Sequence, residues 1–157
     1  VGWMVDAWLY AQDTCSNIVY DGWDEVRDVK VPNNLPTLED VINLGRLVEP
    51  NVNVWTDKSE FRTVDVRVGW DIKMPWQDVP AAMVNLMEAV NSPDNGYKYT
   101  ITPAEFFKEY EEIHPWRDGN GRTGVILFNW LNGTLDNPVW APNLWHDPRR
   151  TIGFAAS

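Results

Sequence analysis

The chain has 157 residues, of which 44% are hydrophobic and 23% are charged. This length and composition suit one globular domain with one core, and they exclude a disordered chain. The net charge of −10 argues against a nucleic-acid partner and against an anionic membrane surface, because both require a basic footprint. Local cations and backbone amides can nevertheless hold a phosphate group on such a chain.

Cysteine usage and apolar runs limit the class of protein further. Cys15 is the only cysteine, so we expect neither an internal disulfide nor a Cys-rich metal site. The two histidines, His114 and His146, cannot build a zinc site by themselves. No apolar run reaches the length of a membrane span, and the first residues lack a basic-then-apolar leader. We therefore expect a cytoplasmic protein that forms a single domain over residues 1–157.

Hydrophobic periodicity predicts helices near the start of the chain. Val1–Gln12 carries apolar residues at three- and four-residue spacings, which is typical of an amphipathic helix. Asp13–Asp21 is polar and is predicted as a loop, and Trp23–Val29 as a short helical turn. Thr37 precedes two acidic residues, which is typical of a capped helix start, and this helix should run to about Val48.

A change of period marks the next segment. In Phe61–Gly69, Val64, Val66 and Val68 alternate with polar residues, which predicts a strand with one buried face. Asp71–Gln77 contains a central proline and is predicted as a bent, edge-like segment.

Two helices are predicted around a short turn in the second half. Before them, Asp78 is expected to cap the start of a helix that runs to about residue 91. Thr102–Glu105 has the form of a capping box with Pro at the first helical position, and its helix should stop at His114 because Pro115 follows. The helix that begins near Arg122 is apolar nearly all round and should be buried. The expected fold is mostly α, with a central buried helix and a small β-hairpin flap.

The turn from His114 to Arg122 has a backbone suited to anions. Gly119 and Gly121 permit positive φ and a close approach of the main chain to a ligand. The amides of Gly119, Asn120, Gly121 and Arg122 lie at a helix N-terminus, where N–H groups and the helix dipole favour negative charge.

Side chains in the same turn add chemistry to that backbone. Arg122 supplies a cation with a fork of donors that suits phosphate. Asp118 is a hard oxygen ligand that suits Mg²⁺ shared with phosphate oxygens. His114 is of a type that accepts a proton near neutral pH. Each residue also has a purely structural explanation, such as an ion pair, a turn or a helix cap, but their combination within one turn favours a site.

This run, His114-Pro115-Trp116-Arg117-Asp118-Gly119-Asn120-Gly121-Arg122, resembles the signature of the Fic (Fido) family, H-P-F-x-D/E-G-N-G-R-x-x-R. Upstream, Phe61–Gly69 resembles the strand that leads into the family's target-docking flap, which would comprise Asp71, Ile72, Lys73 and Met74. The resemblance is strongest over residues 35–135. It implies a protein nucleotidyltransferase that adenylylates (AMPylates) a Ser, Thr or Tyr hydroxyl of a target protein from ATP or another nucleoside triphosphate.

The resemblance also implies a role for each residue of the turn. His114 would be the general base, and Asp118 would hold Mg²⁺ on the phosphates. Gly119, Asn120 and Gly121 would form the anion hole, and Arg122 would grip the β-phosphate. Trp116 replaces the usual Phe and would point into the core.

Two positions depart from the family's pattern. Val125 stands where the signature often has a second Arg that contacts the γ-phosphate, and the loss of one charge-assisted contact costs ~1.5–3 kcal/mol. Gly121 is not Lys, unlike the Doc branch, which phosphorylates its target, so nucleotidyl transfer is favoured over phosphorylation. Thr56–Glu60 has part of the spacing of the family's inhibitory helix but is predicted as an ordinary loop. We expect no built-in inhibitor, and a separate antitoxin-like chain remains a candidate partner.

Three functions therefore stay open. The first is an active nucleotidyltransferase. The second is a nucleotide-binding module of the same fold with weak or lost catalysis, or with another nucleotide donor, which Val125 motivates. The third is a metal-dependent hydrolase that uses His114 and Asp118.

Overall fold

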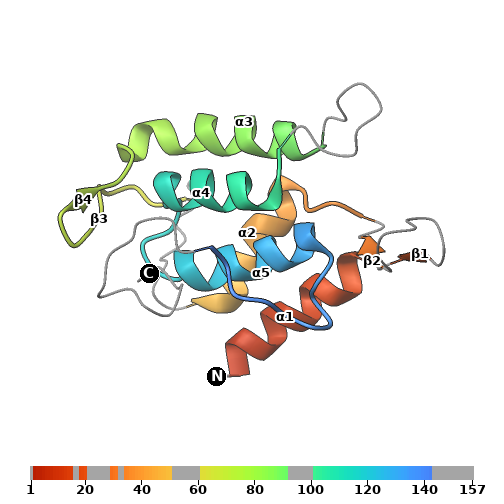
Figure 1. Ribbon diagram of the computed structural model, residues 1–157. Helices are drawn as coiled ribbons and strands as arrows, with labels where there is room; N and C mark the ends of the chain where they lie inside the picture. The colour runs from red at the N-terminus through yellow and green to blue at the C-terminus, as the bar shows by residue number, and fades with distance from the viewer. Residues whose placement is uncertain are drawn as a thin grey trace.

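A computed structural model describes residues 2–15, 18–20, 29–31, 34–50, 61–91 and 101–142, and within them the fold is mostly helical (Figure 1). The elements in chain order are α1 (Gly2–Cys15), β1 (Ile18–Tyr20), β2 (Val29–Val31), α2 (Leu38–Val48), β3 (Arg67–Val68), β4 (Asp71–Ile72), a 3₁₀ turn (Trp76–Asp78), α3 (Val79–Asn91), α4 (Pro103–Ile113) and α5 (Asn120–Asn132). The expected mostly α fold with a small hairpin is confirmed.

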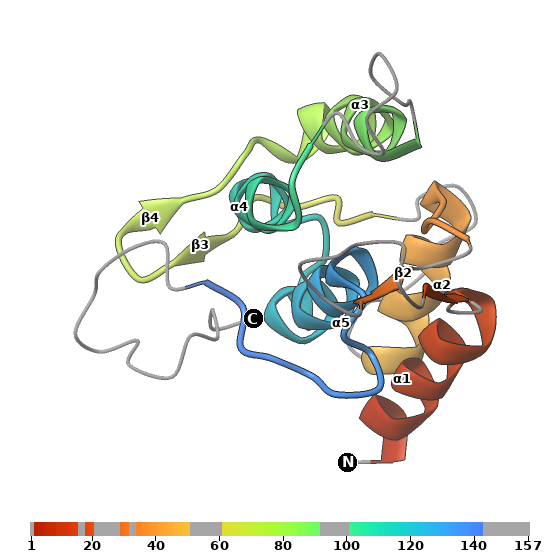
Figure 2. The same ribbon diagram turned by 45° about the vertical axis from the view of Figure 1, so that its right-hand side comes forward.

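Helix α5 is the centre of the core. It packs against α1, α2 and α4, while α3 packs on the outer side of α4 (Figure 2). Its buried face includes Ile126, Leu127, Trp130 and Leu131, and apolar residues on other sides of the helix are buried as well. An apolar helix is stable in water only when neighbours cover it all round, so the prediction of a buried central helix is confirmed.

Local capping signals place the starts of α2 and α4. Thr37 accepts a hydrogen bond from the amide of Asp40, and the Asp40 carboxylate accepts one from the amide of Thr37. Thr102 and Glu105 form the same reciprocal pair at the start of α4. Each box satisfies two N–H groups that have no partner within the helix, and both predicted starts are confirmed.

The first helix is longer than predicted. It continues through Asp13 to Cys15, because the buried stripe of Ala7 and Ala11 recurs at Cys15. Ile18–Tyr20, predicted as part of a loop, pairs antiparallel with Val29–Val31. Most of the helical turn predicted at Trp23–Val29 lies outside the described residues, as do Thr56–Glu60 and His146.

The strand predicted at Phe61–Gly69 is wrong over most of its length. Only Arg67 and Val68 pair, with Ile72 and Asp71 respectively, in a short antiparallel hairpin. Val64, expected on a buried face, is 42% exposed. The rest of the segment is held by other hydrogen bonds: Arg62 donates to the carbonyl of Val64, and the Asp65 carboxylate accepts from the amide of Trp76. The hairpin projects from the helical body beyond the ends of α3 and α4 (Figure 1).

No helix among the described residues combines the length and apolar character needed to cross a membrane.

Candidate active site

The turn between α4 and α5 is fixed by its backbone. His114 ends α4 in the left-handed region, with φ 52° and ψ 65°, since Pro115 disfavours a helical residue before it. Gly119, with φ 85°, precedes α5, which begins at Asn120 and not near Arg122 as predicted. Gly121 lies within α5 and has no positive φ, so only one of the two glycines uses the freedom expected of both.

Trp116 anchors the turn in the core, as expected. Its side chain is buried, and its ring centroid lies 5.2 Å from that of Phe61. A Cβ at Gly45 would come within 2.7 Å of the indole, so α2 can pass over this ring only with a glycine at that position. The indole Nε1 donates to the Tyr110 hydroxyl at 2.7 Å.

A chain of buried hydroxyl groups continues from that contact. Because Thr123 Oγ1 has main-chain carbonyls to which it donates, we assign the proton of its contact with the Tyr110 hydroxyl, at 2.6 Å, to Tyr110. Thr123 Oγ1 in turn lies 3.0 Å from the carbonyl oxygen of Gly119 and 3.1 Å from that of Asn120. Burial raises the pKa of the Tyr110 hydroxyl, which keeps this proton in place. The network ties α4, the turn and the start of α5 into one unit.

Asn120 closes the turn from the other side. Its Oδ1 accepts from the amide of Trp116 and its Nδ2 donates to the carbonyl of the same residue, both at 2.8 Å. The side chain therefore shapes the turn, and only its backbone amide remains for the anion hole in which the residue was predicted. That amide and those of Gly121 and Arg122 lie in the first turn of α5, where no carbonyl of the helix can accept from them.

Arg122 is paired with an acidic residue that the sequence did not single out. Its guanidinium forms an ion pair with Glu49, the last capping residue of α2, and Nη2 lies 3.8 Å from Asp118 Oδ1. The Arg122 side chain is 40% exposed, whereas Glu49 is largely buried. A phosphate group approaching Arg122 would therefore compete with the Glu49 carboxylate for the same donors.

Asp118, predicted as a Mg²⁺ ligand, lies next to the start of α5. Its Oδ1 accepts from the Gly119 amide at 2.8 Å, and the side chain is partly exposed. A partly exposed carboxylate beside an anion site fits Mg²⁺, which commonly takes one or two carboxylates together with substrate phosphates and water. Within the described ranges no group of three or more His, Cys, Asp or Glu could hold a metal by itself. The Asp118 carboxylate therefore fits a metal ion that is shared with phosphate oxygens.

His114 is buried, with 1% of its surface exposed. Its amide donates to the carbonyl of Tyr110 at 2.9 Å, and its carbonyl accepts from Arg62 Nε at 2.6 Å. The position at the lip of the turn is as expected for the main chain, but the imidazole is more enclosed than the sequence suggested. A substrate hydroxyl could reach it only if neighbouring groups move.

Arg62 is a second site neighbour that sequence reasoning missed. Its guanidinium donates to the carbonyls of Ile113 and His114 at the end of α4, and to those of Val64 and Met74 in the flap segment. Its only signal in the sequence is its place in Phe61–Gly69, the segment that resembles the strand before the flap. Burial lowers the pKa of Arg62, with Asp65 acting in the opposite direction, but a guanidinium remains charged in proteins.

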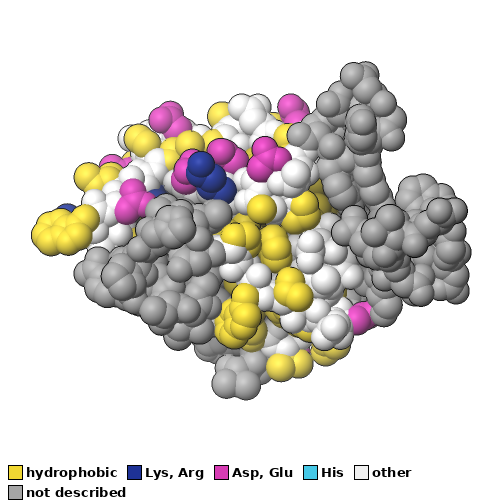
Figure 3. Space-filling model, viewed as in Figure 1, with side chains coloured by type: hydrophobic (Ala, Val, Ile, Leu, Met, Phe, Trp, Pro, Cys, Tyr) yellow, Lys and Arg dark blue, Asp and Glu magenta, His cyan; other side chains and the backbone are white. Residues whose placement is uncertain are grey.

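The predicted flap residues divide between two environments. Asp71 and Ile72 form β4 and are exposed, Ile72 to 76%. Lys73 is buried and donates to the Asp71 carboxylate at 2.7 Å, and Met74 packs against the core. The end of the hairpin carries hydrophobic side chains into solvent (Figure 3), most of all Trp70, which is 88% exposed.

Val125 occupies a packed position. It lies in a small apolar cluster with Phe107, Phe128 and Ala141, and Trp8 packs against both this cluster and the main core. Val125, which stands in the position of the second signature Arg, therefore contributes to apolar packing.

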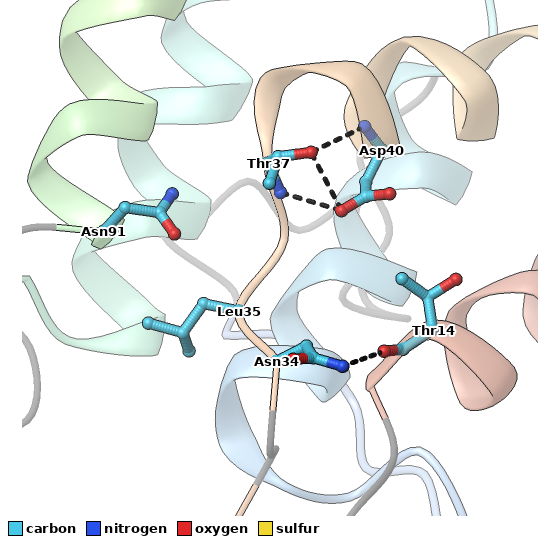
Figure 4. Close-up of a pocket in the computed structure, with 6 residues that line it drawn as sticks. All are labelled: Thr14, Asn34, Leu35, Thr37, Asp40 and Asn91. Atoms are coloured by element: carbon cyan, nitrogen blue, oxygen red, sulfur yellow. Dashed lines mark hydrogen bonds between the residues drawn. The ribbon is translucent and has the colours of Figure 1, made fainter.

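A separate cavity of about 540 Å³ lies at the other end of α2 (Figure 4). Its lining residues are Thr14, Asn34, Leu35, Thr37, Asp40 and Asn91. Thr37 and Asp40 bind one another there in the capping box, and Asn34 Nδ2 donates to the carbonyl of Thr14 at 2.9 Å. None of the predicted site residues lines this cavity.

Comparisons with known proteins bear on the family and the fold of the chain. The family model described as "Fic/DOC family" matches residues 35–132. A crystal structure of a Fic family protein from Desulfovibrio desulfuricans G20 superposes with a TM-score of 0.52 at 20% sequence identity. The match covers 82% of this chain but only 34% of that protein, so this chain corresponds to about a third of the other's length.

Proposed function

This chain belongs to the Fic/DOC family, and we propose that it transfers a nucleotidyl group, AMP from ATP in the simplest case, to a hydroxyl of a target protein. One observation carries the proposal. His114, Asp118 and Arg122 lie on a single turn whose shape is fixed by buried hydrogen bonds from Tyr110, Thr123 and Asn120. A backbone held in this way presents its amides in a fixed direction, so they can stabilise charge in a transition state without reorganising.

The phosphate half of the proposed site is the start of α5. The first-turn amides and the Arg122 guanidinium would bind the phosphate oxygens of the nucleotide. Asp118 would hold Mg²⁺, which supplies charge neutralisation on the phosphates when it is bound. The ion pair between Arg122 and Glu49 must break for Arg122 to bind phosphate, so nucleotide binding would replace the carboxylate by a phosphate group as the partner of Arg122.

The chemical half of the site is His114. A hydroxyl of the target would give its proton to the imidazole while its oxygen attacks the α-phosphorus. The bond from the α-phosphorus to the bridging oxygen would break, and pyrophosphate would leave with the electron pair. The product is a phosphodiester between AMP and the target, and the proton on His114 is later lost to water. Positioning and electrostatics supply most of the catalysis in such transfers.

Next to these two halves, the hairpin is the proposed docking surface for the target. Its exposed strand β4 offers main-chain groups at an edge, and Trp70 and Ile72 offer apolar contact. An extended segment of a target protein, docked along this edge, would be directed toward the end of α4. The hydroxyl to be modified would come from that segment.

Two observations favour a second candidate, a nucleotide-binding module with weak catalysis. Val125 is packed where the signature often has a second Arg, and the side chains proposed for the chemistry are engaged or enclosed, since Arg122 is paired with Glu49 and His114 is buried. This candidate predicts binding of Mg²⁺-nucleotide in calorimetry without transfer to any protein.

The test is incubation of the full chain with each of the four labelled nucleoside triphosphates in a cell lysate, followed by mass spectrometry of labelled proteins. Transfer by wild type that is lost in His114→Ala supports the transferase. Lys108→Ala, an exposed change on α4, is the matched control and should transfer normally. Binding without transfer selects the module, and the absence of both binding and transfer overturns the proposal.

A further inference from the structure

Arg62 connects two parts of the molecule that are far apart in the sequence. It is 4% exposed, and all four hydrogen bonds of its guanidinium end on main-chain carbonyls. Two of these carbonyls belong to Ile113 and His114, at the end of α4. The other two belong to Val64, before β3, and Met74, after β4, so the same side chain holds both ends of the hairpin.

The main chain of Arg62 adds a fifth contact to the turn. Its amide donates to the carbonyl of Pro115 at 3.0 Å. The residue thus binds three successive carbonyls, those of Ile113, His114 and Pro115, around the one described non-glycine residue with positive φ. The carbonyls at the end of α4 carry the negative end of the helix dipole, and a buried guanidinium is a suitable partner for them.

The phosphate side and the target side of the site are anchored mainly by different side chains. The amides at the start of α5 are held by the hydrogen bonds of Tyr110, Thr123 and Asn120. The hairpin and the backbone of His114 are held by Arg62. A change at Arg62 should therefore separate the target side of the site from the phosphate side.

We propose that Arg62 is a positioning residue that fixes the hairpin relative to His114, so that a docked target presents its hydroxyl to the imidazole. The role in presenting the target rests on the proposed transferase function, whereas the coupling of the hairpin to the turn through Arg62 does not. Lys carries the same charge on a compact ammonium with three donors, which cannot span four carbonyls as the guanidinium does. Loss of the fork frees the hairpin while leaving the phosphate side intact.

The variant that tests the inference is Arg62→Lys in the full chain. Arg46→Lys is the matched control, because it makes the same substitution on an exposed residue of α2, away from the proposed site. We expect Arg62→Lys to bind Mg²⁺-ATP within about twofold of wild type. Hydrogen exchange of the Lys73 and Trp76 amides, which bind Val66 and Asp65, should be about tenfold faster or more. Transfer to labelled lysate proteins should fall, whereas Arg46→Lys should match wild type in all three measurements.

A merely structural role gives a different pattern. If Arg62→Lys lowers the thermal midpoint and accelerates exchange throughout α4 and α5, with nucleotide binding lost in parallel, the positioning role is wrong. Unchanged hairpin exchange also overturns it.

Wild type provides a further measurement that needs no variant. Under mild denaturant, the amides of Lys73 and Arg62 should open with the same free energy if the hairpin and the turn are coupled. Opening of the hairpin alone contradicts the coupling. If wild type transfers no label, the transferase proposal fails, but both exchange experiments still decide whether Arg62 couples the two segments.

Discussion

The carboxylate of Glu49, at the end of α2, forms an ion pair with the guanidinium of Arg122 on the first turn of α5. The two residues are brought together because the Glu49 stem lies against Gly119, where a Cβ would come within 3.1 Å of Glu49 Cγ. The pair places a negative charge of the protein beside the donors proposed for phosphate. Glu49 therefore belongs to the site although it lies outside the signature.

Removal of that charge should strengthen nucleotide binding. In Glu49→Gln the competing carboxylate is gone, and a partly exposed ion pair of this kind is worth up to about 1 kcal/mol, so Mg²⁺-ATP should bind about fivefold more tightly. Calorimetry measures the change. Glu88→Gln, which removes an exposed acid from α3, should leave the affinity unchanged. Weaker binding in Glu49→Gln would indicate that Glu49 supports Arg122 in its working position.

A substitution of Trp70, the exposed tryptophan of the hairpin, should affect target recognition without affecting stability. Trp70→Ser removes a side chain that contributes little to the core, so the free energy of unfolding should change by no more than about 0.5 kcal/mol. If Trp70 anchors the target, transfer to lysate proteins should fall about tenfold or more with no change in nucleotide affinity. Leu9→Ser, an exposed apolar change on α1, is the control and should transfer normally. Equal transfer by wild type and Trp70→Ser would remove the hairpin tip from the docking surface.

The buried hydroxyl of Tyr110 should be visible in both stability and its pH dependence. Tyr110→Phe leaves the Trp116 Nε1 without its acceptor and Thr123 without its donor, at a cost of about 1–3 kcal/mol in unfolding free energy. Urea unfolding of both proteins at neutral pH measures this cost.

The pH dependence follows from the direction of the shift. Burial raises the pKa of Tyr110 above its ordinary value of 10.0, so the folded state favours the neutral hydroxyl. The stability that the neutral Tyr110 hydroxyl contributes is fully present below the pKa of Tyr110 in the unfolded chain, and it is lost as the pH rises toward the pKa in the folded protein. Wild-type stability should fall above about pH 10, and the fall should be smaller in Tyr110→Phe. Tyr10, whose pKa is also raised by burial, titrates in both proteins and cancels in the difference. Identical alkaline curves would contradict this assignment.

The sequence predicted those features that depend on neighbouring residues. The caps at Thr37 and Thr102 form within a single turn of chain, and Pro115 acts on the residue directly before it. The apolar character of α5 required burial wherever the helix lay. These parts of the fold were therefore accessible from local pattern, and the signature located the turn.

Contacts between distant segments were not accessible in this way. Arg62 reaches His114 across 52 positions, and nothing in the residues around Arg62 indicates that partner. Val64 follows the alternation of a strand, but its segment is held by the Arg62 side chain and leaves the core, so the expected buried face has nothing to cover it. Glu49 likewise appears in sequence as an ordinary helix end.

The valine in the second arginine position leads to a prediction that distinguishes packing from lost chemistry. If Val125 were only a missing Arg, Val125→Arg should improve nucleotide affinity. Its side chain instead packs with Phe107, Phe128 and Ala141, so we expect the substitution to lower the free energy of unfolding by about 2–3 kcal/mol, because a charge enters an apolar cluster. Urea unfolding and calorimetry with Mg²⁺-ATP measure the two quantities separately. Val125→Met, which enlarges the side chain without charge, controls for volume and should cost less. A stable Val125→Arg protein that binds nucleotide about tenfold more tightly would mean that the cluster tolerates the guanidinium and that its absence limits the natural chain.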